Sequence, residues 1–459
     1  MVFQNNVLSG AAGSGTTVYA IDQSIRFNPA DSAYMEKTFS SAGNKKTFTI
    51  SLWLKRSLLG SRQDIWSFNQ DVPLTFMADD TLRPYIFGNV TLQTNRKFRD
   101  PSAWYHIVFT IDSTNQISSD RIRMYVNGQR ETSFSTEVYP SLNADADIWT
   151  SGTDLRLFRL VGGTNYHGGY AAEIHYLDGI SYGPENFGEV NSSGIWIPKE
   201  YSGSYGTNGF KIDGRDSADL GDDESGNGND FTTSGLAAHD QVSDSPTNNF
   251  ATFNPIHLNT AASLARNATF KNGNIELFSS SGTADFCSTT IMPSAIFKGY
   301  AEFYVTHSGS DGFGSSGVNR IMVLDDNAIT NATTWYSIYN SSGSITTSGE
   351  SAISGTAWAK GDIIGVAVDM ANNIKWYRNG SLLGTADVGA SYQSLGYMYN
   401  IRIGQDTSKN PTIIANFGQE GTFAGNVTAG GNSDASGIGN FKYSVPSGFK
   451  ALCTKNLGS

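Results

Sequence analysis

Several residue types and patterns are scarce in this sequence, and each scarcity excludes a class of protein. Two cysteines, Cys287 and Cys453, cannot form a disulfide framework or a cysteine-based zinc site, so we interpret both as free buried thiols, with a single bridge as the alternative. No run approaches the roughly 18 consecutive apolar residues that a membrane span needs. The N-terminal stretch MVFQNNVLSGAAGSG has neither a basic nor an apolar region, so we expect no signal peptide.

Positive charge is scarce as well. The chain has 31 Lys and Arg residues against 42 Asp and Glu residues, a formal net charge of −11. Binding to nucleic-acid phosphates needs a basic face, so we expect no nucleic-acid partner, and anionic membrane surfaces are disfavoured for the same reason. Sustained 3.6-residue apolar repeats are missing too, whereas 50 glycines and 12% aromatic residues indicate a globular β protein rich in turns.

Period-two alternation predicts antiparallel strands along most of the chain. Between residues 47 and 54 every second side chain is apolar, and the same alternation recurs between residues 363 and 370. The pairs Asn127–Gly128 and Asn379–Gly380 each follow a strand pattern and supply the two positive-φ residues of a tight hairpin turn. We therefore expect meanders of antiparallel strands.

The predicted fold class is all-β, with two tandem antiparallel β-sandwich (jelly-roll) domains. A chain of 459 residues suits two or three domains at roughly 100–200 residues each. We place an N-terminal arm at 1–22, a first sandwich at 23–190 and a second at 256–459. The intervening 191–255 is an irregular, acidic, Gly/Asn-rich connector, which we predict to be a structured linker because its spaced phenylalanines can pack on a domain.

No catalytic constellation is evident in the sequence. Glycoside hydrolysis with retention needs two carboxylates about 5 Å apart, and no E-x-D-x-x-E string that would present such a pair occurs. In the strand predicted over 168–179, alternation places Glu173 and His175 on one face, opposite Ala172 and Ile174. We interpret Glu173 and His175 as the polar outer face of a sheet, and we expect that the protein is not an enzyme.

An acidic stretch is the best candidate for metal binding. Seven acidic residues and two asparagines lie between residues 213 and 230, and calcium takes six to eight oxygen ligands from flexible loops of this kind. The alternative is a solvated turn region, or Asp side chains that cap turns by accepting backbone N–H groups. No cofactor is expected to be required, and calcium is the one candidate ion. The candidate calcium ligands are Asp219, Asp222, Asp223, Glu224, Asn227 and Asp230.

Loop-like stretches that combine aromatic and amide residues are candidates for glycan binding. Sugar rings stack on aromatic faces, and Tyr and Trp supply contact area with little entropy to lose. Taken singly, each aromatic favours packing or an interface over a ligand contact, whereas the set as a whole is consistent with an adhesive surface. The candidate ligand-binding residues are Tyr166, His167 and Tyr170 in the first sandwich and Trp335, Tyr336 and Tyr339 in the second.

Three resemblances to known families extend this reading. WYHIV followed by MYVNGQ, within residues 23–185, resembles laminin-G-like or concanavalin A-like jelly rolls, whose members often bind glycans or proteins. KGYAEFYV, GDIIGVAVDMANNIKWYRNG and a later NFG, within residues 290–420, resemble a SPRY domain, a module that grips partners through loops. FNPADSAYMEKTFSSAGNKKTFTISLWLKR and SGNGNDFTTSGLAAHDQVSDSPTNNFATFNP resemble virion proteins of tailed bacteriophages, in particular tail fibres.

The third resemblance implies a function and a location. It implies a virion protein assembled in the host cytoplasm, with other virion proteins and a host surface glycan or receptor as partners. It also implies a homo-oligomer, with a trimer favoured because fibres of this class resemble trimers. A receptor-binding tail fibre is the expected role. The alternatives are a capsid-decorating or other purely structural virion component and, third, a polysaccharide depolymerase.

Overall fold

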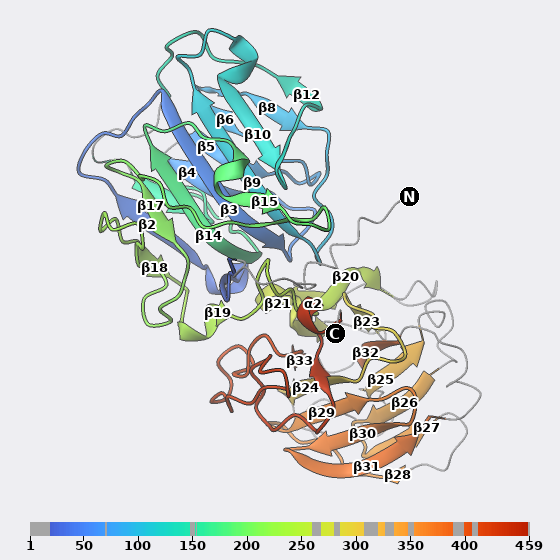
Figure 1. Ribbon diagram of the computed structural model, residues 1–459. Coiled ribbons are helices and arrows are strands. Elements are labelled where there is room, and N and C mark those ends of the chain that lie inside the picture. Colours follow the sequence, from blue (N-terminus) through green and yellow to red (C-terminus); the bar gives the residue numbers. More distant parts are fainter. Residues whose placement is uncertain are drawn as a thin grey trace. The chain divides into compact units, whose positions relative to one another are not determined.

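The structure is a computed structural model that describes residues 19–68, 71–146, 152, 154–258, 268–279, 285–306, 320–325, 335–347, 353–388, 399–405 and 412–457. Contacts divide the chain into a first unit, Met1–Asn248, and a second unit, Asn249–Ser459. Each unit is a sandwich of sheets that are antiparallel apart from the parallel pair of β24 (Gly299–Val305) and β34 (Lys450–Ala451), so the predicted all-β fold class is confirmed (Figure 1). In the part of the chain that is described, no helix is long and apolar enough to cross a membrane.

The first unit packs two large sheets against each other. Its first sheet contains β1 (Ser24–Phe27), β3 (Thr47–Arg56), β9 (Trp104–Asp112), β10 (Ile122–Val126), β11 (Gln129–Arg130), β14 (Gly169–Asp178), β17 (Phe210–Ile212) and β19 (Gln241–Val242). Its second sheet contains β2 (Tyr34–Thr38), β4 (Gln63–Phe68), β5 (Asp71–Phe76), β6 (Tyr85–Ile86), β7 (Asn89–Val90), β13 (Asp154–Leu157) and β18 (Thr232–Ser234). Two small ribbons pair β8 (Leu92–Thr94) with β12 (Phe134–Glu137) and β15 (Gly188–Val190) with β16 (Trp196–Pro198). Short 3₁₀ turns lie at Pro29–Asp31, Ser118–Asp120, Pro184–Asn186 and Ala238–Asp240.

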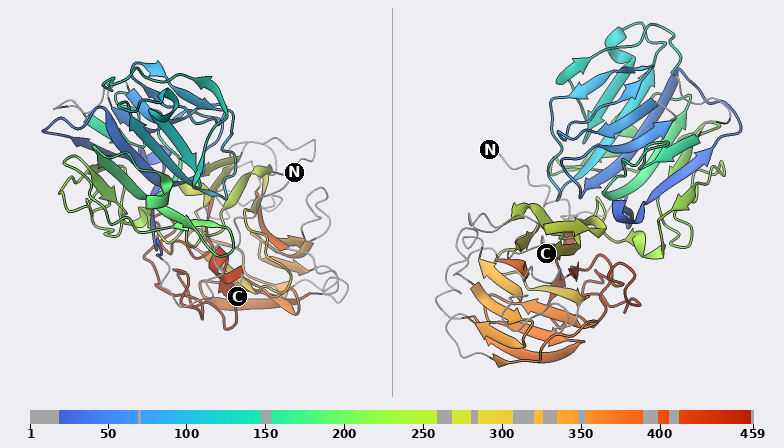
Figure 2. Two further views of the ribbon diagram at one scale, coloured as in Figure 1. Left: turned by 45° about the horizontal axis from the view of Figure 1, so that its top comes forward. Right: turned by 180° about the vertical axis from the view of Figure 1, so that it is seen from behind.

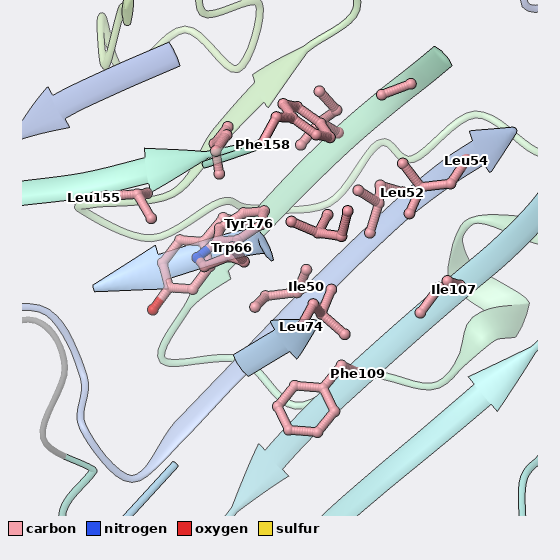
Figure 3. Close-up of a cluster of buried hydrophobic side chains, with 14 of the residues drawn as sticks. Ile50, Leu52, Leu54, Trp66, Leu74, Ile107, Phe109, Leu155, Phe158 and Tyr176 are labelled. Carbon is pink, nitrogen blue, oxygen red and sulfur yellow. The ribbon is translucent and has the colours of Figure 1, made fainter. Parts of the chain in front are cut away.

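The core of the first unit follows the predicted alternation. Ile50, Leu52 and Leu54 of β3 lie on one face and point toward Trp66 and Leu74 of the opposite sheet (Figure 3). All five side chains are fully buried. The Asn127–Gly128 pair closes the β10–β11 hairpin with φ values of 50° and 77°, as predicted.

The segment predicted as a linker is part of the first unit up to residue 248. Its strands β17, β18 and β19 pair with β14, β2 and β1, so the segment contributes to both large sheets. The domain boundary therefore lies near residue 248 rather than at 190. Residues 1–18 of the predicted arm lie outside the described residues, whereas Ile21 donates its N–H to Thr247 Oγ1 at 2.9 Å.

A β-bulge interrupts the alternation predicted for β14. The pairing register with β3 shifts between Ala172 and His175, and Glu173 adopts a φ of 47°. Ala172 therefore packs on the outer face of the sheet, whereas Ile174 and Tyr176 enter the core. The prediction that Ala172 shares a face with Ile174 is wrong, because the extra residue of a bulge changes the phase of the strand.

The second unit also contains two sheets, which Figure 2 shows from two further sides. One sheet contains β20 (Phe253–Leu258), β23 (Asp285–Thr289), β25 (Arg320–Asp325), β26 (Trp335–Asn340), β27 (Ser344–Thr347), β28 (Ile353–Ser354) and β32 (Tyr399–Gln405). The other contains β21 (Ala268–Lys271), β22 (Glu276–Ser279), β24 (Gly299–Val305), β29 (Ile363–Val368), β30 (Asn373–Arg378), β31 (Ser381–Asp387), β33 (Thr412–Asn416) and β34 (Lys450–Ala451). A 3₁₀ turn at Asn272–Asn274 and the short helix α2 (Thr454–Leu457) complete the unit.

Several predictions for the second unit are confirmed. Residues 364, 366, 368 and 370 enter the core, and Asn379–Gly380 closes the β30–β31 hairpin with φ values of 49° and 78°. Cys453 is fully buried, as predicted. The side chain of Cys287 lies outside the described part of the chain.

Candidate functional site

A groove at the edge of the second sheet of the first unit is the best candidate site. One wall is the hairpin of β6 and β7, the last two strands of that sheet, and the other is the segment 138–145 that follows β12. The groove has a volume of about 310 Å³, at the lower end of the range of small-molecule sites. It is lined by Ile86, Phe87, Asn89, Thr91, Val138, Tyr139, Pro140, Ser141, Ala144 and Asp145.

The first wall contains a residue in a strained backbone conformation. Ile86 pairs with Asn89, so Phe87 and Gly88 form a two-residue turn with φ values of 57° and 69°. Such turns favour Asn or Asp followed by Gly, because a bulky side chain at positive φ is disfavoured. Strain of this kind costs about 1–3 kcal/mol and concentrates at functional sites. Phe87 thus lines the groove and packs against the core of the first unit, at a cost to the backbone of the turn.

The second wall is fixed to the body of the unit by hydrogen bonds. Val138 donates its N–H to Thr91 O at 2.7 Å, and Arg121 Nη1 donates to Pro140 O at 2.9 Å. The Tyr139 hydroxyl donates to Glu137 Oε1 at 2.8 Å, and partial burial together with that carboxylate raises the pKa of Tyr139 to about 12. The ring of Tyr139 is thus held in place, with its hydroxyl protonated.

The groove combines apolar rings with polar groups, one of which, Asp145, pairs with Lys46 at 3.8 Å. Phe87 and Tyr139 are half-buried, and Asn89, Ser141 and Asp145 are exposed. Thr91 is 2% exposed, and its Oγ1 has no hydrogen-bond partner among the described residues. A buried hydroxyl without a partner is unfavourable, so it marks a position where a ligand could supply the missing hydrogen bond.

The predicted ligand-binding residues of the first unit lie elsewhere. His167 is fully buried, with Nδ1 3.0 Å from Gln63 Oε1, and Tyr170 is 1% exposed. Both rings pack inside the unit and offer no face to a sugar, so they do not form the predicted stacking surface. Tyr166 alone is partly exposed, and its ring lies 6.4 Å from that of Tyr34.

The predicted residues of the second unit are also packed. Tyr336 is 4% exposed, and Tyr339 is fully buried with its hydroxyl donating to Thr356 O at 2.6 Å. Both belong to the core of that unit rather than to an open surface. The side chain of Trp335 lies outside the described residues.

The acidic stretch does not present a set of metal ligands. Within the described residues, no three His, Cys, Asp or Glu side chains lie close enough to share an ion. Asp223 instead accepts the backbone N–H groups of residues 211, 225 and 229, and Arg215 pairs with Glu224 at 3.2 Å. Of the other candidate ligands, Asp219 and Asp230 accept backbone N–H groups, Asn227 donates to two backbone carbonyls, and Asp222 is partly exposed. The geometry favours the turn-capping alternative, and calcium binding stays a prediction.

The bulge in β14 places Glu173 at the centre of a buried polar network. Glu173 accepts the Tyr19 hydroxyl at 2.7 Å and lies 3.0 Å from His175 Nε2 and 3.3 Å from Lys211 Nζ. Burial opposes ionisation of Glu173, but the hydrogen bonds and charges of these neighbours together lower its pKa to about 2. The predicted outer-face position is confirmed, although the carboxylate is 6% exposed and faces protein groups rather than water.

A nearby serine–histidine pair has the wrong proton arrangement for nucleophilic catalysis. Ser51 Oγ lies 2.9 Å from His106 Nε2, and Trp196 Nε1 donates to His106 Nδ1 at 3.0 Å. An indole N–H can only donate, so Nδ1 is the acceptor and Nε2 carries the proton. His106 therefore donates to Ser51, whereas a general base must accept the serine proton. Burial lowers the pKa of His106 to about 3, which keeps the ring neutral.

Sequence reasoning missed the groove. The one local signal was the Phe–Gly turn at 87–88, where Asn or Asp is expected before Gly. The second wall comes from a segment about 50 residues later, and its placement depends on the pairing of β8 with β12, which alternation does not reveal.

Comparisons with known proteins support the fold of the first unit. The sequence pattern of the concanavalin A-like lectin/glucanases superfamily matches residues 30–171. No curated protein sequence matches the chain.

The solved structures that resemble the chain are distant from it in sequence. The SPRY domain of human HERC1 is 17% identical, with a TM-score of 0.27 over 36% of this chain and 96% of that domain. A heptameric SAP-like pentraxin from Limulus polyphemus is 14% identical, with a TM-score of 0.27 over 36% of this chain and 80% of the other. A candidate carbohydrate-binding protein from Bacteroides ovatus is 14% identical, with a TM-score of 0.33 over 47% and 58%. These likenesses concern the fold alone, and none of the three is a virion protein.

Proposed function

We propose that the protein binds glycans through the groove of its first unit, without cleaving them. The observation that carries the proposal is the groove itself, which joins two fixed aromatic rings to a partnerless buried hydroxyl on a lectin-like fold. Of the ten lining residues only Asp145 carries a carboxylate. Glycoside hydrolysis commonly uses a pair, so the lining favours binding over catalysis.

Loss of the Tyr139 ring tests the proposal. Tyr139→Ala should weaken binding of the best ligand on an array of neutral and acidic oligosaccharides about 10-fold, a difference of about 1.4 kcal/mol, because a stacking face is removed. Tyr182→Ala is the matched control, since Tyr182 is 41% exposed on the same unit and does not line the groove. Equal affinity of both variants, or no array ligand at all for the wild type, would reject the groove as a glycan site.

Substitution of Thr91 separates binding from folding. Thr91→Val keeps the side-chain shape but removes a hydroxyl that has no partner within the described residues. The variant should be as stable as the wild type or more stable, because a partnerless buried polar group costs about 1–3 kcal/mol. Its glycan affinity should nevertheless fall. A variant that is both more stable and undiminished in affinity would show that the hydroxyl serves no ligand.

We further propose that this binding serves attachment of a virion to its host, in a homo-oligomer for which a trimer is favoured. The support is the resemblance of most of the first 255 residues to tail-fibre proteins, and a structural virion component is the alternative. The test is mass spectrometry of purified particles whose genome encodes this chain. It should detect the chain in the particles and give its copy number per particle. Absence from the particles would overturn it, and a copy number that matches the capsid would favour the structural alternative.

A further inference from the structure

A cluster of arginines and tyrosines lies on the outer side of the second sheet of the first unit. We call it the arginine face, formed by Tyr34, Arg62, Arg83, Arg156, Arg159 and Tyr166. On β13 the neighbouring Leu155 and Leu157 enter the core, so Arg156 between them is directed outward. None of these six residues lines the groove.

Two tyrosine rings hold the guanidinium of Arg159. Its carbon lies 4.7 Å from the ring centre of Tyr34 and 5.2 Å from that of Tyr166. Arg159 Nε donates to Gly163 O at 2.8 Å, while its two terminal nitrogens have no hydrogen-bond or ion-pair partner within the described residues. Stacking on aromatic faces fixes the plane of a guanidinium and leaves its terminal N–H groups available.

A second guanidinium of the arginine face, that of Arg83, has no partner at hydrogen-bond distance among the described residues, although Asp64 and Asp79 lie near enough to attract its charge. Arg83 makes no side-chain hydrogen bond and no ion pair in the described part of the structure, and its Nε is buried. Arg62, by contrast, donates to Asp64 at 3.0 and 3.1 Å, and Arg156 pairs with Glu36 at 3.1 Å. Burial lowers the pKa of Arg83, and the positive charge of Arg62 lowers it further.

Arg83 and Arg159 belong to one continuous surface. Asp64, which holds Arg62, also accepts Asn165 Nδ2 at 2.8 Å, and Asn165 directly precedes Tyr166. The carboxylate of Asp79, the other acid near Arg83, already accepts the N–H and the hydroxyl of Thr81. In a chain with a net charge of −11, this local excess of guanidinium groups is unusual.

We propose that the arginine face is a second binding site, specific for a uronate-containing saccharide. Guanidinium groups form paired hydrogen bonds to carboxylates, and Arg83 and Arg159 have the free donors to do so. The lectin-like fold of this unit favours a saccharide over an acidic peptide as the source of the carboxylate. The site is separate from the groove and does not depend on the function proposed for it.

The test uses the full-length protein and defined hexasaccharides of galacturonate, mannuronate and hyaluronan. Calorimetry should show binding to at least one of them, and added salt should weaken that binding. The methyl ester of the same saccharide should bind at least about 10-fold more weakly, since hydrogen bonds to an ionised group are roughly twice as strong as those to a neutral one. Arg83→Gln and Arg159→Gln should each weaken binding several-fold, and together more than 10-fold. Arg159→Lys should restore only part of the affinity, because an ammonium lacks the planar fork.

Matched measurements make the outcome unambiguous. Arg130→Gln is the control, because Arg130 is an exposed arginine of the other sheet that pairs with Asp120. It should bind like the wild type. The proposal would be overturned if none of the three uronates bound, or if the folded Arg83→Gln and Arg159→Gln variants bound as well as the wild type. It would also be overturned if the methyl ester or hexaglutamate bound as tightly as the uronate.

Discussion

Replacing Glu173 with alanine should lower the free energy of unfolding of the first unit by about 3–5 kcal/mol, the usual cost of breaking a buried ion pair from one side. The carboxylate is the shared partner of Tyr19, His175 and Lys211. Without it, the polar groups of these three side chains would lack this partner in a buried region. Denaturant unfolding, with hydrogen exchange of peptides from each unit, measures the loss and assigns it to the first unit. Glu189→Ala, at an exposed position, should change stability by less than about 0.5 kcal/mol.

The same carboxylate predicts a loss of stability in acid. The pKa of Glu173 falls from 4.5 in an unfolded chain to about 2 in the folded one. Its contribution is therefore complete above pH 4.5 and disappears as the pH falls through about 2, a change of about 3 kcal/mol at 1.36 kcal/mol per pH unit. Glu173→Gln should lack this acid-dependent step. A variant with the full acid dependence of the wild type would place its origin elsewhere.

Glu302 in the second unit should give the opposite pH dependence. Burial raises its pKa from 4.5 to about 7. The backbone N–H groups of Lys442 and Tyr443 donate to the carboxylate at 2.8 and 2.9 Å and oppose this rise. A raised pKa means that the folded state holds its proton more tightly. The second unit should therefore be most stable below pH 4.5 and lose about 3 kcal/mol as the pH rises through about 7.

Unfolding of the second unit between pH 4.5 and 8, followed by hydrogen exchange, tests this prediction. Glu302→Gln should remove most of the pH dependence. Glu302→Ala should destabilise at every pH, because each backbone N–H left without an acceptor costs about 1–3 kcal/mol. Stability that rises between pH 4.5 and 7 would contradict the pKa shift and its cause.

Regular strands could be predicted from the sequence because their signal is local. In residues 47–54 and 363–370, every second side chain is apolar. The face of each strand that enters the core could therefore be predicted. The phase of β14 could not be predicted past Ala172, because a bulge is set by the pairing with β3 rather than by composition. The boundary near residue 248 was missed for a related reason, since the short strands of the connector are defined by the sheets they join.

The candidate site was less predictable than the fold. Aromatic content suggested Tyr170 and Tyr339 as ligand-binding residues. A large ring in a loop-like stretch is usually buried, however, and both of these rings are buried. The net charge argued against nucleic acids and anionic membrane surfaces as partners, yet an average over the chain conceals the arginine face around Arg159. Both proposed sites depend on side chains that tertiary pairing leaves without partners among the described residues, and a sequence pattern does not record that.

The pairing of β1 with β19 has a consequence for synthesis of the chain. Ser24 lies opposite Val242, and in the second unit Phe250 lies opposite Cys453, so each unit is closed by its own two ends. Contacts of such long sequence separation form late, because the loop between them must first be ordered. On the ribosome, the first unit cannot complete its sheet until residue 242 has emerged, and the second unit cannot form its Phe250–Cys453 bridge until residue 453 has emerged. Translation rate and nascent-chain protection therefore matter more for this protein than for one built from local hairpins.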